Sequence, residues 1–383
     1  MKSVLQLFGG DKVIWVLIVA LTIFSGLAVA SSVVSLAYED GNVAIHIIRH
    51  SSFLLIGWFI IYVVHLIPYK MYSVFAQLLV VIAAGLLILT LISGKQINEA
   101  ARWLTVPGTG FSFQTSDFAK LVLIIFVARY LSRNQTDIQS FKKGFLPVFI
   151  WILLICGLIL PANLSTAGIL FLTCLVLLYI GRVRLVYLLG LIALGLVALT
   201  LFIVVAKNSD SQNRTGTWGN RVMTYVQPDE GGDTFQADKA KIAIANGGVF
   251  GKFAGHSTQK HSLPQAYSDF IFAIIIEEYG FLLGALPLSF IYLILLFRAG
   301  IIVRKCDRTF PAFLAIGLTL GIVLQAYVNM GVAVGLLPVT GQPLPWISRG
   351  GTSILFTSVA FGIILGISRS IEQEEQEALE ETE

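Results

Sequence analysis

The chain has 383 residues, of which 56% are hydrophobic and only 13% are charged, and its mean hydropathy is +0.83. Charged residues normally make up about a quarter of a soluble globular chain, so this composition excludes a soluble protein, a disordered chain and a collagen-like repeat. The net charge of +4 conceals an acidic tail, because seven of the 22 acidic residues lie in residues 372–383. We therefore predict an all-α polytopic membrane protein.

Ten apolar segments are predicted to span the membrane, since a helix needs about 20 apolar residues to cross a bilayer. The first follows Lys2 and Lys12 and looks like a signal peptide. Its apolar stretch of about 23 residues exceeds the usual 7–15 of a signal sequence, so we interpret it as a retained helix. The ten segments lie at about 13–35, 52–68, 72–93, 117–131, 145–160, 167–181, 184–206, 269–297, 311–335 and 352–368.

The distribution of basic residues predicts the orientation. If the N-terminus is cytoplasmic, fourteen basic residues lie in inside segments, and the short outside loops hold only Arg49, Lys95, Arg102 and Arg349. Cytoplasmic loops are enriched in Lys and Arg, so this split favours ten spans with both termini in the cytoplasm.

This topology gives one transmembrane domain, residues 1–371, with a large extracytoplasmic loop at 207–268 between the seventh and eighth spans. The acidic tail, residues 372–383, is expected to be a disordered cytoplasmic extension. No G-x-x-x-x-G-K-[ST] motif occurs, and the inside loops are too short for a nucleotide-binding domain. The three cysteines and five histidines lack metal-site spacing, so neither a nucleotide nor a zinc site is expected.

Asp269 begins the eighth predicted span. A carboxylate at the start of a helix suits the helix dipole, and a simple cap is one interpretation. The other is a general base or metal ligand at the outer edge of the membrane, where partial desolvation suits a carboxylate to take a proton from a hydroxyl.

Glu277 and Glu278 follow two turns later, about 12 Å deeper at 1.5 Å per residue. Adjacent carboxylates inside a span are costly, which favours a functional site. They face directions about 100° apart, so they should not serve one narrow site together. The alternative is structural pairing, for example with Lys120.

Two basic residues follow the third predicted span. Arg102 lies in the outer loop 94–116, and Lys120 lies near the start of the fourth span. Arg102 stands beside Trp103, which is typical of an interface anchor, but a guanidinium also matches phosphate oxygens. Lys120 lies within the fourth span, where Thr115 or Ser116 can cap the helix.

Two outer loops carry further candidates. The large loop has mixed charge, including Arg214 and Arg221, and its Gly-rich stretch 246–252 would let the backbone approach an anion. The loop at 336–351 has three prolines and three glycines that forbid a regular helix, and it carries Ser348 and Arg349. Irregular backbone near membrane depth is tolerated where it lines a polar cavity. The pattern indicates an outward-facing cavity for an anionic, membrane-borne ligand such as a lipid pyrophosphate.

The sequence resembles the SEDS family (shape, elongation, division and sporulation proteins) over most of its length. The similarity is strongest in Ala101–Arg133, Phe235–Gly280 and Gln325–Arg369, and Leu336 to Ser353 matches the family's signature. The resemblance implies a ten-helix peptidoglycan glycosyltransferase of the bacterial cytoplasmic membrane that polymerises lipid II at the outer face. Its implied partners are lipid II, a class B penicillin-binding transpeptidase, other divisome or elongasome membrane proteins and membrane lipid, with no nucleic acid.

The resemblance also implies residue roles. Asp269 matches the family's catalytic aspartate, Arg102 an outer-loop arginine and Lys120 a conserved-motif lysine. Gln265 and Asp117 stand where Glu is usual, and Arg349 where Tyr is common. The expected substrate-binding residues are Arg102, Lys120, Arg214, Arg221, Ser348, Arg349 and Ser353, and the expected structural or secondary polar residues are Asp117, Gln265, Glu277 and Glu278.

The implied reaction begins with Asp269 as general base on the 4-hydroxyl of the acceptor GlcNAc, which then attacks C1 of the donor sugar and expels undecaprenyl pyrophosphate. A divalent cation, Mg²⁺ or Mn²⁺, can assist this reaction by binding at Asp269 and neutralising the leaving phosphates. The N-terminal segment and Gly341–Pro345 favour division-type FtsW members over elongation-type RodA members. The alternatives are a lipid II flippase or ion-coupled transporter that uses Glu277, Glu278 and Lys120, and a non-catalytic scaffold.

Overall fold

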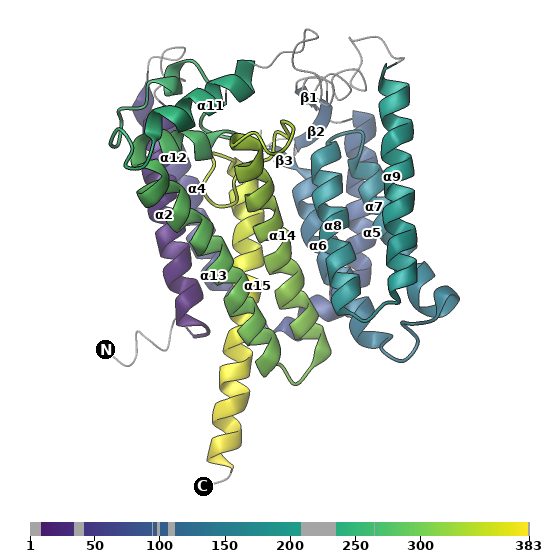
Figure 1. Ribbon diagram of the computed structural model, residues 1–383. Coiled ribbons are helices and arrows are strands. Elements are labelled where there is room, and N and C mark those ends of the chain that lie inside the picture. Colours follow the sequence, from purple (N-terminus) through teal and green to yellow (C-terminus); the bar gives the residue numbers. More distant parts are fainter. Residues whose placement is uncertain are drawn as a thin grey trace.

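The computed structural model describes residues 9–33, 42–93, 95–97, 100–105, 112–207, 235–263 and 265–381. Long helices run side by side in one bundle, and short elements gather at one end of it (Figure 1). The long helices are α2 (Lys12–Ser32), α4 (Val43–His65), α5 (Tyr69–Ser93), α6 (Thr115–Arg133), α7 (Leu146–Ile159), α8 (Leu164–Ile180), α9 (Leu185–Lys207), α13 (Leu286–Lys305), α14 (Thr309–Ala333) and α15 (Gly351–Glu380). The shorter helices are α11 (Phe235–Gly247) and α12 (Ile271–Gly280), with wider turns at Phe141–Phe145 and Phe281–Ala285 and a tight turn at Gln259–His261.

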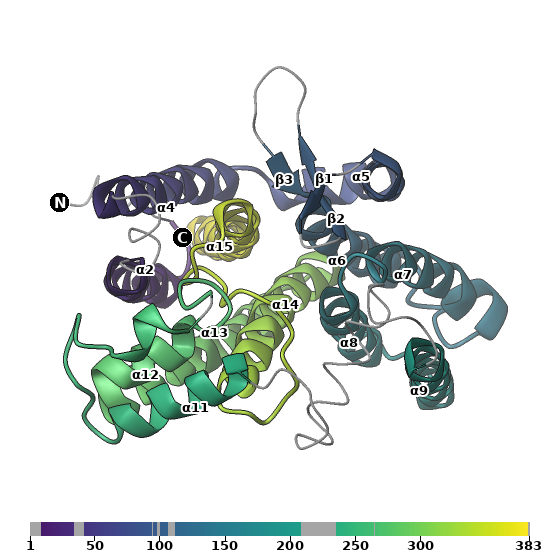
Figure 2. The same ribbon diagram turned by 90° about the horizontal axis from the view of Figure 1, so that it is seen from above.

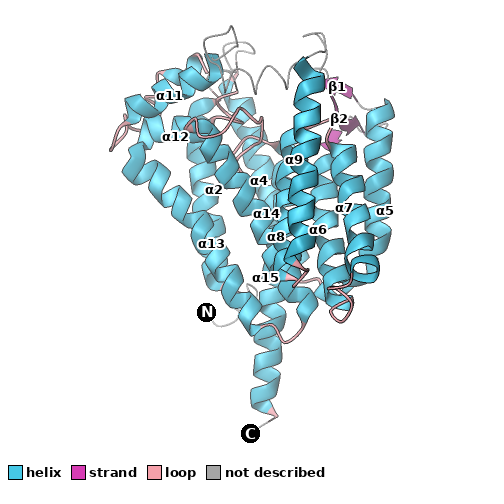
Figure 3. Cartoon of the chain, turned by 45° about the vertical axis from the view of Figure 1, so that its right-hand side comes forward, coloured by secondary structure: helices cyan, strands magenta, loops and turns pink. Residues whose placement is uncertain are grey.

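The all-α membrane architecture is confirmed for the described residues. Seven helical segments are long and apolar enough to cross a membrane. The other long helices, α6, α8 and α9, lie among them in the same bundle (Figure 3). The number of ten spans stays a prediction. The start of α2 and the end of α15 lie at the same end of the bundle, where the Gly10 amide donates to Glu372 at 2.9 Å.

α15 lies in the middle of the bundle, with α4 on one side and α14 on another (Figure 2). Glycines permit its close approach to α4: a methyl group at Gly362 would lie 2.7 Å from the Val64 side chain, and one at Gly366 would lie 3.1 Å from the His65 carbonyl. Small residues at helix contacts are how membrane helices maximise packing. α15 is therefore packed tightly against α4, and the 336–351 loop leads directly into this fixed helix.

A small antiparallel sheet was not predicted from the sequence. It comprises β1 (Lys95–Ile97), β2 (Ala100–Thr105) and β3 (Ser112–Gln114), with β2 in the middle. Trp103 pairs with Gln114 and Thr105 with Ser112. The sheet lies in the segment that was predicted to be an outer loop. It forms because the backbone groups that emerge from the bundle here pair with one another.

The predicted eighth span, 269–297, is wrong as a single helix. The chain breaks at Gly280, whose φ of 73° is a left-handed conformation that favours glycine. α12 ends there, and the stretch Ile271–Lys305, which as a whole is long and apolar enough to cross a membrane, continues from Phe281 through α13. The continuous apolar sequence concealed the break.

Two other boundaries differ from expectation. α4 begins at Val43, so Arg49 lies in a helix rather than in an outside loop. The acidic tail is not disordered up to Glu380, because α15 continues as one helix beyond the bundle (Figure 3). The tail is rich in good helix formers, and its first turns are fixed by contacts of Glu372 with Gly10 and of Glu375 with Lys305.

Candidate functional site

Asp269 lies in the turn that precedes α12, at the end of the bundle that carries β1–β3 and α11. Its side chain is half-buried, and the Ser268 hydroxyl donates to its Oδ1 at 3.0 Å. The cap position of α12 is Phe270, and no side chain caps the helix there. Asp269 is therefore not the N-cap residue of α12.

The 336–351 loop packs against the residues just before Asp269. The Ser348 hydroxyl donates to the Ser268 carbonyl at 2.6 Å and accepts from the Leu344 amide at 2.8 Å. The Arg349 amide donates to the Tyr267 carbonyl at 2.9 Å. The predicted residues Ser348 and Arg349 thus lie beside Asp269 and hold its segment.

The Arg349 side chain points to neighbouring helices. Its Nη2 donates to Nδ1 of His46 on α4 at 2.9 Å, and its guanidinium lies over the Tyr267 ring, 5.4 Å from the centroid. Stacked guanidinium groups gain cation–π stabilisation. On the adjacent turn of α4, His50 bonds to the Ser25 hydroxyl at 2.8 Å, and this hydroxyl donates to the Ile347 carbonyl. These contacts favour a structural role for Arg349.

Two amides on α14 hold the loop from the other side, and the sequence analysis missed both. The Asn329 side chain is 1% exposed, and its Nδ2 donates to the Asp269 carbonyl at 2.8 Å and to the Gln342 carbonyl at 2.7 Å. One turn away, Gln325 Nε2 donates to the Pro343 carbonyl at 2.9 Å. Polar residues four apart within an apolar span are the signal that could have identified them.

Gly341 brings the loop backbone close to the carboxylate. Its φ is 64°, and a methyl group at this position would lie 3.5 Å from Asp269 Oδ2. On the far side, Gln342 Nε2 donates to the Thr166 hydroxyl of α8 at 2.8 Å. The loop therefore joins α8 and α14 to the Asp269 segment.

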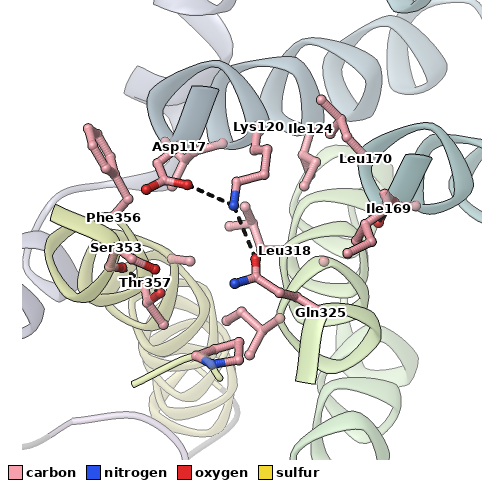
Figure 4. A pocket seen from close by; sticks show the side chains of 16 residues that line it. Asp117, Lys120, Ile124, Ile169, Leu170, Leu318, Gln325, Ser353, Phe356 and Thr357 are labelled. Carbon is pink, nitrogen blue, oxygen red and sulfur yellow. Dashed lines mark hydrogen bonds and ion pairs between the residues drawn. The ribbon is translucent and has the colours of Figure 1, made fainter. Parts of the chain in front are cut away.

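A pocket lies between α6, α8, α14 and α15 (Figure 4). Lys120 Nζ lies 2.8 Å from Asp117 Oδ1 and donates to Gln325 Oε1 at 3.1 Å. Ser353 also lines the pocket, so three predicted site residues share it. Gln325 links this pocket to the 336–351 loop because its oxygen meets Lys120 and its amide meets Pro343.

The pocket combines one ion pair, Lys120 with Asp117, with an apolar wall, which suits an amphiphilic ligand. The apolar lining residues are Leu121, Ile124, Ile169, Leu170, Leu318, Ile322, Pro345, Phe356 and Ala360.

Glu277 and Glu278 lie outside this site, and each is held by hydrogen bonds to other segments. Glu277 accepts hydrogen bonds from the Ser257 hydroxyl, from the Thr258 amide at 3.1 Å and from the Gln259 amide at 3.2 Å. Glu278 accepts from Ser31, at the outer end of α2, and from the Ser257 amide at 3.4 Å.

Both carboxylates contact Ser257, Glu277 through the hydroxyl and Glu278 through the amide. Their contacts are those of structural residues, and Lys120 pairs elsewhere.

The remaining predicted residues are described only in part. Arg102 lies in β2, but its side chain is outside the described part of the chain, and Arg214 and Arg221 lie wholly outside it. Gln265 is exposed with a left-handed φ of 55°, and its carbonyl accepts from the Ser268 amide at 2.9 Å. The substrate-binding roles of Arg102, Arg214 and Arg221 stay predictions, and so does the secondary polar role of Gln265.

A divalent cation was considered for Asp269. Within the described ranges, no three His, Cys, Asp or Glu side chains gather in a metal-binding group. Mg²⁺, however, commonly uses one or two carboxylates together with substrate phosphates. Asp269, with the adjacent Ser268 hydroxyl, fits such a single-carboxylate arrangement.

The chain is similar to proteins of known families. The model of the FtsW/RodA/SpoVE family, described as cell cycle proteins, matches residues 11–373. A relative from Coxiella burnetii named probable peptidoglycan glycosyltransferase FtsW is 33% identical over 375 residues, covering 94% of this chain and 96% of the relative. The stage V sporulation protein E of Bacillus subtilis is 33% identical over 331 residues, covering 84% and 86%.

Solved structures share the fold. A chain of a peptidoglycan synthase complex, studied for its coordination of polymerization and crosslinking, has a TM-score of 0.74 at 25% identity, covering 95% of this chain and 99% of that one. The Thermus thermophilus rod shape determining protein RodA has a TM-score of 0.68 at 24% identity, covering 94% and 97%. The latter similarity supports the fold alone.

Proposed function

Because this chain belongs to the FtsW/RodA/SpoVE family of cell cycle proteins, we propose that it is a peptidoglycan glycosyltransferase. It polymerises lipid II into glycan strands at the outer face of the bacterial cytoplasmic membrane. The observation that carries the proposal is the half-buried Asp269, whose carbonyl accepts from Asn329 and whose neighbour Ser268 accepts through its carbonyl from Ser348. A carboxylate fixed in this way is pre-organised for proton transfer.

Asp269 is the general base of the proposed reaction. Its carboxylate takes the proton of the acceptor 4-hydroxyl as that oxygen forms a bond to C1 of the donor sugar. The bond between C1 and the pyrophosphate oxygen breaks, and its electron pair leaves with undecaprenyl pyrophosphate. The Ser268 hydroxyl, which donates to Oδ1, orients the carboxylate so that Oδ2 faces Gly341 and the acceptor.

The pocket around Lys120 is proposed to hold the anionic, lipid-linked part of the substrate. Lys120 is held by Asp117 and Gln325, so an entering anion would share its ammonium group with the Asp117 carboxylate. Ser353 adds a hydroxyl on the same wall, and the apolar lining accepts isoprenoid carbon. A divalent cation at Asp269 would supply charge stabilisation for the leaving pyrophosphate.

The proposed partner is a class B penicillin-binding transpeptidase that crosslinks the new strands. The similar structure from a peptidoglycan synthase complex supports this pairing. Septal synthesis is the proposed setting, supported by the name FtsW of relatives at 33% identity, and an elongation role is the alternative.

Asp269→Asn tests the proposal. The amide cannot accept the proton, so we expect polymerisation of purified lipid II to fall by about 10²–10⁴-fold. The matched control is Asp238→Asn, which changes an exposed carboxylate on α11 of the same outer end and should leave the rate unchanged. Both variants are to be assayed with the partner transpeptidase and with Mg²⁺ or Mn²⁺ present.

The rivals make different predictions for the same samples. Full activity in folded Asp269→Asn would exclude the base assignment. If the wild type forms no glycan but moves lipid II across vesicles in response to a proton gradient, the protein is a transporter. The described contacts do not favour that outcome, because Lys120 lies in the pocket while Glu277 and Glu278 bind the 257–259 segment.

A further inference from the structure

The Gly-rich stretch 246–252 is explained by packing rather than by an anion. A methyl group at Gly247 would overlap the Ile276 carbonyl, and one at Gly251 would overlap the Glu278 carbonyl. The carbonyls of Gly248 and Val249 accept from the amides of Phe281 and Leu282, each at 3.0 Å. These glycines therefore let the backbone lie directly on the break between α12 and α13.

The turn built in this way presents large apolar side chains to the outside. We call Val249–Phe253 the outer turn; Val249 is 56% exposed, Phe250 70% and Phe253 79%. Beside it lie Phe281 and Leu283 at the start of the α13 segment, which are 56% and 58% exposed. Side chains of this kind normally avoid water, and a contiguous apolar patch marks an interaction surface.

The depth of the outer turn follows from two ties that join the α2 region to α13 and to α12. At the cytoplasmic end, Arg298 Nε and Nη2 donate to Asp11 Oδ2 at 2.8 and 2.5 Å. At the outer end, Glu278 accepts from Ser31. From Arg298 to Phe281 the helix rises at most about 26 Å, at 1.5 Å per residue.

The hydrocarbon core of a bilayer is about 30 Å thick. With Arg298 near the inner boundary of this core, Phe281 lies inside the outer boundary. The outer turn, bonded to Phe281 and Leu282, then lies at that boundary and not in bulk water.

The apolar surface also continues along a helix that faces lipid. Phe290, Leu293, Ile294 and Phe297 of α13 are exposed on a segment long and apolar enough to span the membrane. Lys252, within the outer turn, places its ammonium 3.6 Å from Glu277, so the one charge of the turn is paired.

We propose that the outer turn inserts Val249, Phe250 and Phe253 into the outer leaflet beside α13. The ligand of this surface is the acyl-chain region of the membrane lipid. Because the turn is bonded to the end of α12, and Asp269 immediately precedes the start of α12, insertion fixes the height of the Asp269 segment relative to the bilayer. The insertion itself is independent of the proposed reaction.

The test is a depth measurement with spin labels on the full chain in vesicles of phosphatidylethanolamine and phosphatidylglycerol. Labels are placed at Phe250→Cys and Phe253→Cys in a Cys306→Ser background, where Cys156 and Cys174 are buried and unreactive. Collision rates with oxygen, which concentrates in lipid, are compared with those of a water-soluble nickel chelate.

Two reference sites calibrate the result. Phe290→Cys is a lipid-facing site on α13, and Lys241→Cys is a solvent-facing site on α11. We expect labels at 250 and 253 to show the high oxygen-to-nickel ratio of 290. A ratio equal to that of 241 would overturn the proposal in favour of a water-exposed turn. Low access to both reagents would also overturn it, because a second copy or another protein would then cover the turn.

Discussion

Both amide hydrogens of Asn329 are used to hold the backbone of the proposed site. One goes to the Asp269 carbonyl and the other to the Gln342 carbonyl, and the side chain is almost fully buried. Asn329→Ala would leave two buried carbonyls without donors, each at a cost of about 1–3 kcal/mol. We expect a lower melting temperature in detergent and a fall in kcat for lipid II polymerisation that exceeds any change in KM.

Thr319 provides a matched control on the same helix. It is also fully buried, but its hydroxyl has no hydrogen-bond partner among the described residues. Thr319→Val removes that group without a change of shape, so stability should be equal or higher and kcat unchanged. Equal loss of activity in the two variants would mean that α14 tolerates no substitution, and the positioning role of Asn329 would be withdrawn.

At the residue scale, the sequence predicts part of the site and not the rest. Asp269, Lys120 and Ser348 stand out because polar groups at the membrane edge, in a span or in an irregular loop need an explanation. Asn329 and His46 act on Asp269 and Arg349, residues far away in the chain, and no local pattern reveals such partners. The meeting of both carboxylates with Ser257 likewise depends on the break at Gly280.

At the scale of elements, Glu277 acts as the anchor of the segment that leads to Asp269. Its two oxygens accept from the Ser257 hydroxyl, the Thr258 hydroxyl and amide and the Gln259 amide, and they lie near Lys252. Glu277→Gln would turn an NH₂ group toward these donors, and breaking a buried charged network costs about 3–5 kcal/mol. We expect faster hydrogen exchange and proteolysis in 252–260.

Glu278→Gln is the comparison for that experiment. Glu278 Oε2 is buried with no hydrogen-bond partner in the described structure, and only its Oε1 accepts from Ser31 and Ser257. A neutral amide therefore loses little, and the protection of 252–260 should be nearly that of the wild type. Equal protection in both variants would contradict the anchoring role of Glu277.

Helix positions follow from the sequence to within a few residues wherever an apolar run ends in charged or turn-forming residues, as in α2, α5 and α14. The failures have local causes. The start of α4 was missed because His46, Arg49 and His50 interrupt the apolar run, although His46 contacts Arg349 of the 336–351 loop, His50 contacts Ser25 of α2 and Arg49 is exposed. The break at Gly280 was missed because apolar residues continue on both sides of it.

At the scale of the whole molecule, Asp11 fastens the start of α2 to the inner end of α13. Its Oδ1 accepts from the amides of Val13 and Ile14 and so caps α2, while its Oδ2 receives two bonds from Arg298. The Asp11 side chain is only 4% exposed and that of Arg298 is 29% exposed. Two functions of one carboxylate can therefore be separated by substitution.

Asp11→Asn keeps an oxygen for the cap but weakens the ion pair, whereas Asp11→Ala removes both. A helix cap contributes about 0.5–2 kcal/mol, so the alanine variant should be less stable than the asparagine variant by that amount. Combining Asp11→Asn with Arg298→Gln should show a coupling of about 0.5–3 kcal/mol in the free energy of unfolding, measured by thermal or denaturant unfolding in detergent. Additive effects would mean that the pair does not join the helices. With coupling, the Asp11–Arg298 pair would hold α2 against α13 and the Ser31–Glu278 contact would hold its other end against α12, and both contacts would set the height of the Asp269 segment relative to the bundle.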